Sequence, residues 1–248
     1  MNKTKTVAVV VIGAEVLSGK VEDANGPHLI RELRRLGAKL GELRVIDDGI
    51  EIISNTVSEL AQRFDYVITT GGIGPTHDDL TLAGVARSFG VAVVRDPELV
   101  ATIEDYYGER LVESHLRLAE VPDGAVLHRG DAPVPTIQMR NVFILPGVPQ
   151  LMRSCFGQIS SSLQGPDFVT RILYLSVGEA EIAQALLETE NAEPSVAIGS
   201  YPRYDGGPAR VKVTVESVDP AAVGRSVARL RQLLPESAIL DDREESVL

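Results

Sequence analysis

The sequence has little cysteine and no long apolar run. Cys155 is the only cysteine among 248 residues, so no disulfide can form within the chain, and its helix-like surroundings favour a buried thiol over a nucleophile. No segment approaches the roughly 18 apolar residues that a membrane-spanning helix needs. Residues 1–13 contain too short an apolar stretch for a targeting segment. We therefore expect a cytoplasmic protein that does not bind a membrane.

Positive charge is also scarce. The 24 Lys and Arg are outnumbered by 35 Asp and Glu, which gives a formal net charge of −11. Nucleic-acid-binding proteins usually present a basic surface, so this balance argues against a nucleic acid as the main partner. With 44% hydrophobic residues, the chain can bury one substantial core and a small second one.

The first part of the chain alternates apolar segments with segments of helical periodicity. Strands are expected at 7–12, 40–46 and 64–70, with helices at 24–36 and 50–63 between them. This βαβαβ order predicts a mostly parallel sheet with helices on both faces, a three-layer Rossmann-like α/β fold. In such folds the loops at the carboxyl ends of the strands lie at one edge and bind ligands.

The segments that follow are predicted with the same rules. Residues 97–122 are expected to be helical, and residues 127–133 to form a loop over the site. An apolar strand at 142–145 then precedes a helix that begins near Gln150.

The most informative stretch is TTGGIGPTHDDLT, residues 69–81, which follows the third expected strand. Its glycines, Gly71, Gly72 and Gly74, have no Cβ and let a ligand approach the backbone amides closely. A helix is expected to begin near Asp79, and the amides of a helix N-terminus attract anions. The stretch is therefore typical of a phosphate-binding turn.

Two adjacent carboxylates, Asp78 and Asp79, follow these glycines. Beside a phosphate they would repel it unless a cation lay between, so they point to a magnesium-like ion held with help from substrate oxygens. The alternative is an ordinary Gly-Gly loop in which both Asp residues only cap a helix; Thr76 or Asp78 is the expected cap.

Further acidic residues follow the other strands. Glu15 comes after the first strand, and Asp47 and Asp48 come after the second. Because parallel strands end at one edge of a sheet, we expect these side chains to gather with Asp78 and Asp79. Five carboxylates make a better metal hypothesis than any pair, although a charged residue at a strand end is often only a solvated loop residue.

The chain resembles the CinA (competence/damage-inducible protein A) family, within the MoaB/Mog-like molybdopterin-binding superfamily. It resembles at least as closely the amino-terminal molybdopterin-binding-like domain of eukaryotic FAD synthases, and the resemblance covers about residues 6–165. The motifs that carry it are GAEVLSG (13–19), DAN (23–25), VIDD (45–48), GGIGPTHDD (71–79), LPGVP (145–149) and, for the FAD synthases, GSYP (199–202).

The resemblance implies a metal-dependent hydrolase of the pyrophosphate bond in a nucleotide such as ADP-ribose or FAD. In this hypothesis a divalent ion, magnesium, manganese or cobalt, is held by Asp79, Asp78 and Glu15, and lowers the pKa of an attacking water. Asp79, Asp48 and Asp47 are the catalytic candidates, with Asp47 or Asp48 as the base. The residues expected to bind the substrate or its phosphate are Gly13, Glu15, Asn25, Thr70, Gly71, Gly72, Gly74, Pro75, Thr76, Thr81, Pro146 and Gly147.

Two other functions remain open. The broader superfamily implies a molybdopterin- or nucleotide-binding protein, or an adenylyl transferase, which would use the same glycine loop. A catalytically inactive interaction module is the third option, because Ala14 and Leu151 stand where the resembling families commonly have acids. The expected partner is a nucleotide or a pterin-nucleotide, and a homo-oligomer, a dimer or a trimer, is expected.

The order of elements changes near residues 164–167. Beyond this point the pattern predicts strands and helices in the order β-α-β-β-α-β. The tail resembles the K-homology-like domain of the CinA family, yet it lacks a basic Gly-x-x-Gly clamp for RNA. From Phe168 onward it has 8 Lys and Arg against 13 Asp and Glu. We expect domains at 1–166 and 167–248, with the second, a small α+β domain, packing, dimerising or covering a site; its last strand is expected at 238–240.

Overall fold

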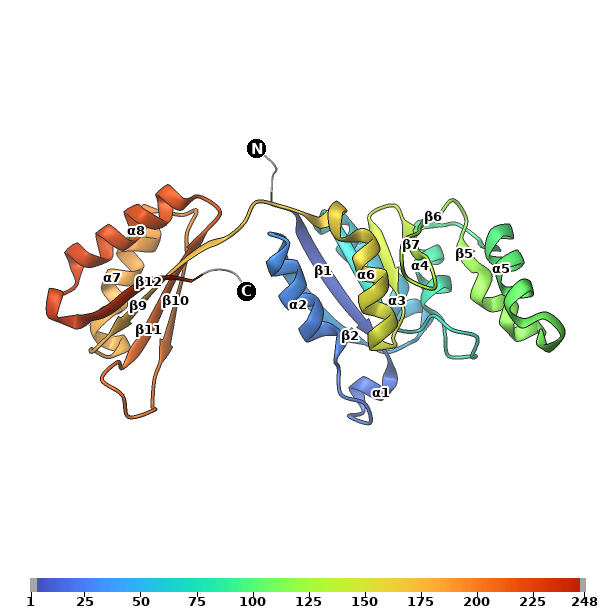
Figure 1. Cartoon of the computed structure of the whole chain (residues 1–248), viewed down its shortest axis with the longest axis horizontal. Helices are drawn as coiled ribbons and strands as arrows, with labels where there is room; N and C mark the ends of the chain where they lie inside the picture. The colour runs from blue at the N-terminus through green and yellow to red at the C-terminus, as the bar shows by residue number, and fades with distance from the viewer. Residues whose placement is uncertain (1–3, 246–248) are drawn as a thin grey trace. The chain divides into compact units, whose positions relative to one another are not determined.

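The structure is a computed structural model of the whole chain, and it describes residues 4–245 (Figure 1). The described residues divide into two compact units between Gly165 and Pro166. Each unit has its own hydrophobic core. No helix within residues 4–245 combines the length and the apolar character that crossing a membrane requires.

The first unit is built on a six-stranded sheet of order β2-β1-β3-β8-β7-β6. The first four strands of this order run parallel, as predicted, and the last two add antiparallel pairs that the sequence did not predict. The strands are β1 (Thr6–Ile12), β2 (Lys39–Ile46), β3 (Tyr66–Thr70), β6 (Val126–His128), β7 (Thr136–Met139) and β8 (Val142–Leu145).

Helices cover both faces of this sheet, which gives the predicted three layers (Figure 1). Alternate residues of β1 enter different cores: Val7 and Val9 pack with α2 and α6, and Ala8 and Val10 pack with α3 and α4. β1 is thus buried on both faces, as its continuous apolar sequence requires. The helices are α1 (Ala14–Leu17), α2 (Asn25–Arg35), α3 (Ile50–Arg63), α4 (Thr81–Phe89), α5 (Pro97–Tyr107) and α6 (Pro149–Leu163).

The predicted helix over 97–122 is wrong beyond Tyr107. Gly108 takes a positive φ of 50° and ends α5. Two 3₁₀ segments follow, η1 (Gly108–Arg110) and η2 (Glu113–Ala119), before β5 (Glu120–Pro122) pairs with β4 (Val93–Arg95). The predicted loop at 127–133 also begins inside β6. Short strands whose partners are distant in sequence leave no local periodicity to recognise.

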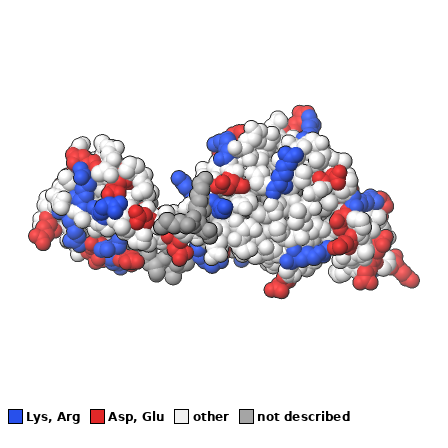
Figure 2. Space-filling view, turned by 90° about the horizontal axis from the view of Figure 1, so that it is seen from above, with Lys and Arg blue, Asp and Glu red and all other residues white. Residues whose placement is uncertain are grey.

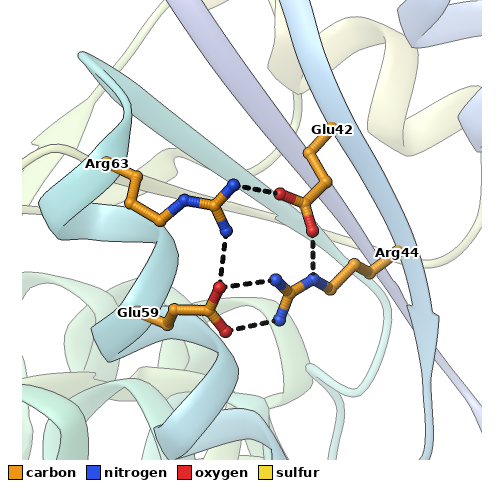
Figure 3. A network of polar contacts seen from close by, with 4 residues as sticks. All are labelled: Glu42, Arg44, Glu59 and Arg63. Carbon is orange, nitrogen blue, oxygen red and sulfur yellow. Dashed lines mark hydrogen bonds and ion pairs between the residues drawn. The ribbon is translucent and has the colours of Figure 1, made fainter.

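Ion pairs tie the edge strand β2 to α3 (Figure 3). Arg44 of β2 bridges Glu42 and Glu59, and Arg63 reaches the same two carboxylates. The guanidinium groups of Arg44 and then Arg63 lower the pKa of the Glu59 carboxyl to about 2. Charged side chains along β2 also discourage pairing of this edge with another strand.

The second unit is a four-stranded antiparallel sheet of order β10-β11-β9-β12 with two helices. The predicted β-α-β-β-α-β order is observed. The last strand runs on to Glu245 instead of ending near residue 240, because its charged residues pair along the edge of β9. The elements are β9 (Val169–Leu175), α7 (Glu179–Ala192), β10 (Ala197–Pro202), β11 (Val211–Ser217), α8 (Pro220–Leu233), η3 (Glu236–Ala238) and β12 (Ile239–Glu245).

The surface carries charges of both signs. On the face shown in Figure 2, Lys and Arg are interspersed with Asp and Glu on both units and form no continuous basic area. This face therefore offers no single-sign field that would attract a long polyanion.

Candidate functional site

The carboxyl ends of the four parallel strands are bound to one another through the loops that follow them. The Gly13 amide, after β1, donates to the Ile46 carbonyl at the end of β2 (3.1 Å). The Gly71 amide, after β3, donates to the Leu145 carbonyl at the end of β8 (3.2 Å). Motifs that lie far apart in the sequence therefore meet at one edge of the sheet, as predicted from the strand order.

Glycine is required where the β1, β3 and β8 loops touch. Gly71 has a φ of 103°, and a Cβ on it would lie 2.2 Å from the Ile12 carbonyl oxygen. A Cβ on Gly147 would lie 3.2 Å from the Gly71 Cα. The two loops thus approach backbone to backbone, which side chains would prevent.

Thr81 braces the second glycine of the pair. A Cβ on Gly72, whose φ is 64°, would lie 2.4 Å from the Thr81 hydroxyl oxygen. The Thr81 hydroxyl donates to the Gly71 carbonyl (2.8 Å), and its amide donates to the Gly72 carbonyl (3.0 Å). Thr81 is fully buried, so it shapes the loop from behind.

The glycine loop presents unused donors. Within residues 4–245, the backbone amides of Gly72, Ile73 and Gly74 donate to no protein acceptor. Successive free amides at a strand-to-helix junction are a common way to hold an anion. This loop is therefore a candidate anion site at the sheet edge.

Asn25 and Thr70 order the loop after β8. The Asn25 side-chain amide donates to the Thr70 hydroxyl (3.0 Å) and to the Gly147 carbonyl (2.8 Å), and the Thr70 hydroxyl donates to the Pro146 carbonyl (2.8 Å). Asn25 is only 6% exposed. Both of its amide hydrogens are used, so it has none left for a phosphate oxygen.

The same network fixes the orientation of the Asn25 amide. The Gly147 carbonyl can only accept, so the nitrogen must face it and Oδ1 must face away. Within the part of the chain that is described, this buried Oδ1 accepts no hydrogen bond. A buried acceptor without a donor costs about 1–3 kcal/mol, which a bound water or a ligand donor would recover.

Asp79 closes the loop that precedes α4. Its Oδ2 accepts from the Thr76 amide (2.8 Å) and the Thr76 hydroxyl (2.5 Å). A Cβ on Gly74 would lie 2.6 Å from the same Oδ2, so this glycine makes room for the carboxylate. The helix expected to begin near Asp79 is α4, which begins at Thr81. The predicted cap at Thr76 or Asp78 is wrong, because the N-cap is Leu80 and makes no side-chain cap.

Arg117, which the sequence did not single out, holds this loop from η2. Its guanidinium donates to the carbonyls of Thr76 (2.5 Å), Pro75 (3.3 Å) and Asp79 (3.4 Å). A pocket of about 290 Å³ lies here, and Gly74, Asp79, Arg95 and Arg117 are among its lining residues. Nothing local in the sequence marks Arg117, because its partners are 38–42 residues away.

Asp47 and Asp48 are adjacent carboxylates after β2, and the Asp48 amide donates to Asp47 Oδ1 (2.8 Å). The pKa of Asp48 is raised, mainly by a side-chain hydrogen bond to Asp47 and then by burial, while the Ala14 amide acts in the opposite direction. The pair lies beside the loop after β1, where Ala14 begins α1.

The five predicted carboxylates do not converge. Within residues 4–245, no group of three or more His, Cys, Asp or Glu side chains is arranged to hold a metal ion. Local contacts hold these acids in their own loops instead: Asp79 accepts from Thr76, and Asp47 accepts from the Asp48 amide (2.8 Å). The neighbouring Thr76 side chain lowers the pKa of Asp78. Glu15 lies against Gly13 in the first loop. This donor set does not fit a metal ion held by the protein alone.

Comparison with known families covers nearly the whole described chain. Residues 8–164 match the model of a probable molybdopterin binding domain, and residues 167–243 match the model described as FAD synthase, middle domain. The two matches meet within a few residues of the boundary between the two structural units.

Individual relatives agree with these matches. The chain is 30% identical to the probable FAD synthase of Caenorhabditis elegans, over 94% of this chain and 51% of that protein. It is also 30% identical to a putative competence-damage inducible protein of Clostridium beijerinckii, over 86% of this chain and 55% of that protein. The chain thus spans about half the length of these relatives. A solved structure of the protein CinA, of unknown function, from Thermoplasma acidophilum superposes with a TM-score of 0.59 at 26% identity, covering 65% of this chain and 100% of that one.

Proposed function

The chain belongs to the family of probable molybdopterin-binding domains, and on this basis we propose that its first unit binds a phosphorylated pterin or a nucleotide at the carboxyl edge of the sheet. The observation that carries the proposal is the row of free amides from Gly72 to Gly74. A phosphate oxygen accepts hydrogen bonds and carries the negative charge that such amides attract. The relatives named as FAD synthases support a ligand of nucleotide type.

Each surrounding residue has a separate role in this proposal. Thr81 and Gly71 fix the conformation of the loop after β3, and Asn25 with Thr70 fixes the loop after β8 against it. Arg117 binds carbonyls of the loop at residues 75–79 and adds a positive charge beside the phosphate site. The Asn25 Oδ1 accepts a hydrogen bond from a water or from an N–H or O–H group of the ligand.

Hydrolysis of a pyrophosphate bond, as in ADP-ribose or FAD, is the second candidate. The raised pKa of Asp48 favours it, because a carboxyl that holds its proton more readily than usual suits general acid–base chemistry. The separate carboxylates do not support a protein-held divalent ion, so the proposal assigns no step to a metal. Transfer of an adenylyl group would use the same binding loops.

Binding is tested with a matched pair of glycine variants. Gly72→Ala places a Cβ 2.4 Å from the Thr81 hydroxyl at a φ of 64°, whereas Gly90→Ala has a similar φ of 67° and no neighbour within 4 Å. Isothermal titration with ADP-ribose, FAD and molybdopterin should show at least about tenfold weaker binding for Gly72→Ala and no change for Gly90→Ala. Equal binding by both variants and the parent chain would place the ligand elsewhere.

Turnover is tested separately. The chain is incubated with ADP-ribose or FAD, with and without magnesium, manganese or cobalt, and the products are identified by mass spectrometry. AMP that disappears in Asp48→Asn supports the hydrolase, and binding without AMP supports a binding protein. Light scattering on the same samples tests the expected dimer or trimer.

A further inference from the structure

The sheet of the second unit has one face that its helices do not use. Leu173, Val211 and Val213 pack with residues of α7 and α8 in the core of the unit. Because side chains alternate along a strand, the residues between them project from the opposite face. Strand register aligns Tyr201, Lys212, Tyr174 and Asp241 in one row across all four strands of this face.

Two arginine side chains lie against the ring of Tyr174, which is on a central strand. The Arg203 guanidinium lies 5.2 Å and the Arg243 guanidinium 5.0 Å from the centre of its ring. Arg243 also donates to the Tyr174 hydroxyl (2.7 Å). The aromatic ring thus holds two cations close together, a placement that like charges would otherwise resist.

These arginines line a pocket of about 410 Å³. One wall is the turn that contains Gly207 and Pro208, and the other is Leu240 and Asp241 of β12. The pairing of β12 with β9 shifts register between Ile239 and Asp241, which places Leu240 in a bulge at the pocket. The volume lies within the range of about 300–1,000 Å³ typical of small-ligand sites.

The charges here differ from the rest of the unit. From Phe168 onward the chain has 8 Lys and Arg against 13 Asp and Glu, yet Arg203 and Arg243 both line this pocket. Lys212 pairs in register with Tyr174, and the neighbouring acids are Asp205, which pairs with Arg203, and Asp241, which pairs with Arg243. Two further tyrosines are exposed nearby in the chain: Tyr201, in register with Lys212, is 54% exposed, and Tyr204, next to Arg203, is 92% exposed. Exposed aromatic rings beside cations suit a ligand with both a phosphate and a flat base.

We propose that this face binds a mononucleotide, with its phosphate on Arg203, Lys212 and Arg243 and its base stacked on an exposed tyrosine. The RNA-recognition motif shows that aromatic side chains on the open face of a four-stranded sheet can stack bases. The overall acidity of the unit opposes a long polyanion, which would extend beyond the three cations. A single nucleotide needs only the local positive charge.

The test uses the full chain and 8-azido-AMP as a photoaffinity probe, with labelled peptides identified by mass spectrometry. Labelling is expected in peptides that contain Tyr201 or Tyr204. Arg243→Gln removes a phosphate contact and should weaken AMP binding at this site about tenfold. Arg229→Gln is the matched control, because Arg229 is exposed on α8, in the helical layer of the unit.

Other outcomes separate this site from the first unit. Gly72→Ala should leave labelling of the second unit unchanged, whatever it does to the first. Labelling confined to residues 4–165, or equal labelling of Arg243→Gln and the parent chain, would overturn the proposal. So would preferential labelling by a single-stranded oligonucleotide, which would indicate a polymer site, or AMP-insensitive crosslinks between two copies of this face, which would indicate an interface.

Discussion

The two units place their candidate ligand-binding groups in different parts of a sheet. In the first unit the central parallel strands β1, β3 and β8 are buried on both faces, so the loops at their ends are left for a ligand. In the second unit the helices cover one face of an antiparallel sheet, so side chains in mid-strand, such as Tyr174 and Lys212, carry the candidate site. Sheet type thus decides whether backbone amides or side chains meet the ligand.

The sharpest contrast in stability is between two aromatic residues of central strands. Phe143 in β8 is fully buried and stacks on Tyr66, so Phe143→Ala should lower the free energy of unfolding by about 3–5 kcal/mol. Tyr174→Ala in β9 should cost clearly less, because the Tyr174 side chain is only partly buried. Hydrogen exchange of peptides from each unit measures the two effects separately. Equal losses would break the distinction between a doubly buried and a half-buried sheet.

Gly72→Ala and Gly90→Ala sharpen the role of the β3 loop. Both glycines have positive φ, so each alanine should cost about 1–2 kcal/mol through backbone strain. Gly72→Ala adds a clash with the Thr81 hydroxyl and should be the more destabilising of the two. Urea unfolding of both variants measures the difference. Equal midpoints would mean that the loop yields freely and is not pre-formed.

Arg117→Ala should loosen the loop at residues 75–79 without unfolding the first unit. The variant removes the guanidinium donors to Thr76 and Asp79, so the amides of residues 76–79 should exchange faster. Arg110→Ala is the control, because Arg110 donates only to the neighbouring Tyr106 carbonyl among its described hydrogen bonds. Unchanged exchange at 76–79 would remove Arg117 from the account of the site.

Two carboxyls should give small pH effects of opposite sign. The pKa of Glu59 is lowered to about 2, so its contribution to stability is present above the unfolded value of about 4.3 and is lost as pH falls toward 2. The pKa of Asp48 is raised, so its contribution falls as pH rises from about 3.9 to its folded value. Thermal unfolding of Glu59→Gln and Asp48→Asn at several pH values should show each slope disappear. Glu59 is exposed, so its effect should shrink in salt.

The sequence predicted the parallel half of the first sheet because the cause is local. Val7–Ile12 is apolar throughout, and helix periodicity at 24–36 and 50–63 spaces the strands. Because parallel strands end at one edge of a sheet, the strand order also placed Gly13, Gly71 and Gly147 at that edge. Element order in the second unit was equally visible, because Val211, Val213 and Val215 alternate with polar residues.

What the sequence missed depends on contacts between distant residues. β12 carries the charged stretch LDDREE, which becomes a strand only because β9 lies beside it. Arg117 joins the site through carbonyls 38–42 residues away. The expected carboxylate cluster does not form, because Asp79 is hydrogen-bonded to Thr76 and Asp48 interacts with Asp47, each within its own loop.

Amide chemical shifts test the central claim most directly. In the ¹⁵N-labelled full chain, titration with ADP-ribose should shift the amides of Gly72, Ile73 and Gly74 most among residues of the first unit, because these donors would meet the phosphate. Gly90, at the far end of α4, provides the internal reference. Saturable shifts at the three loop amides would support the account. Saturable binding that leaves them unmoved while other amides of the first unit shift would contradict it.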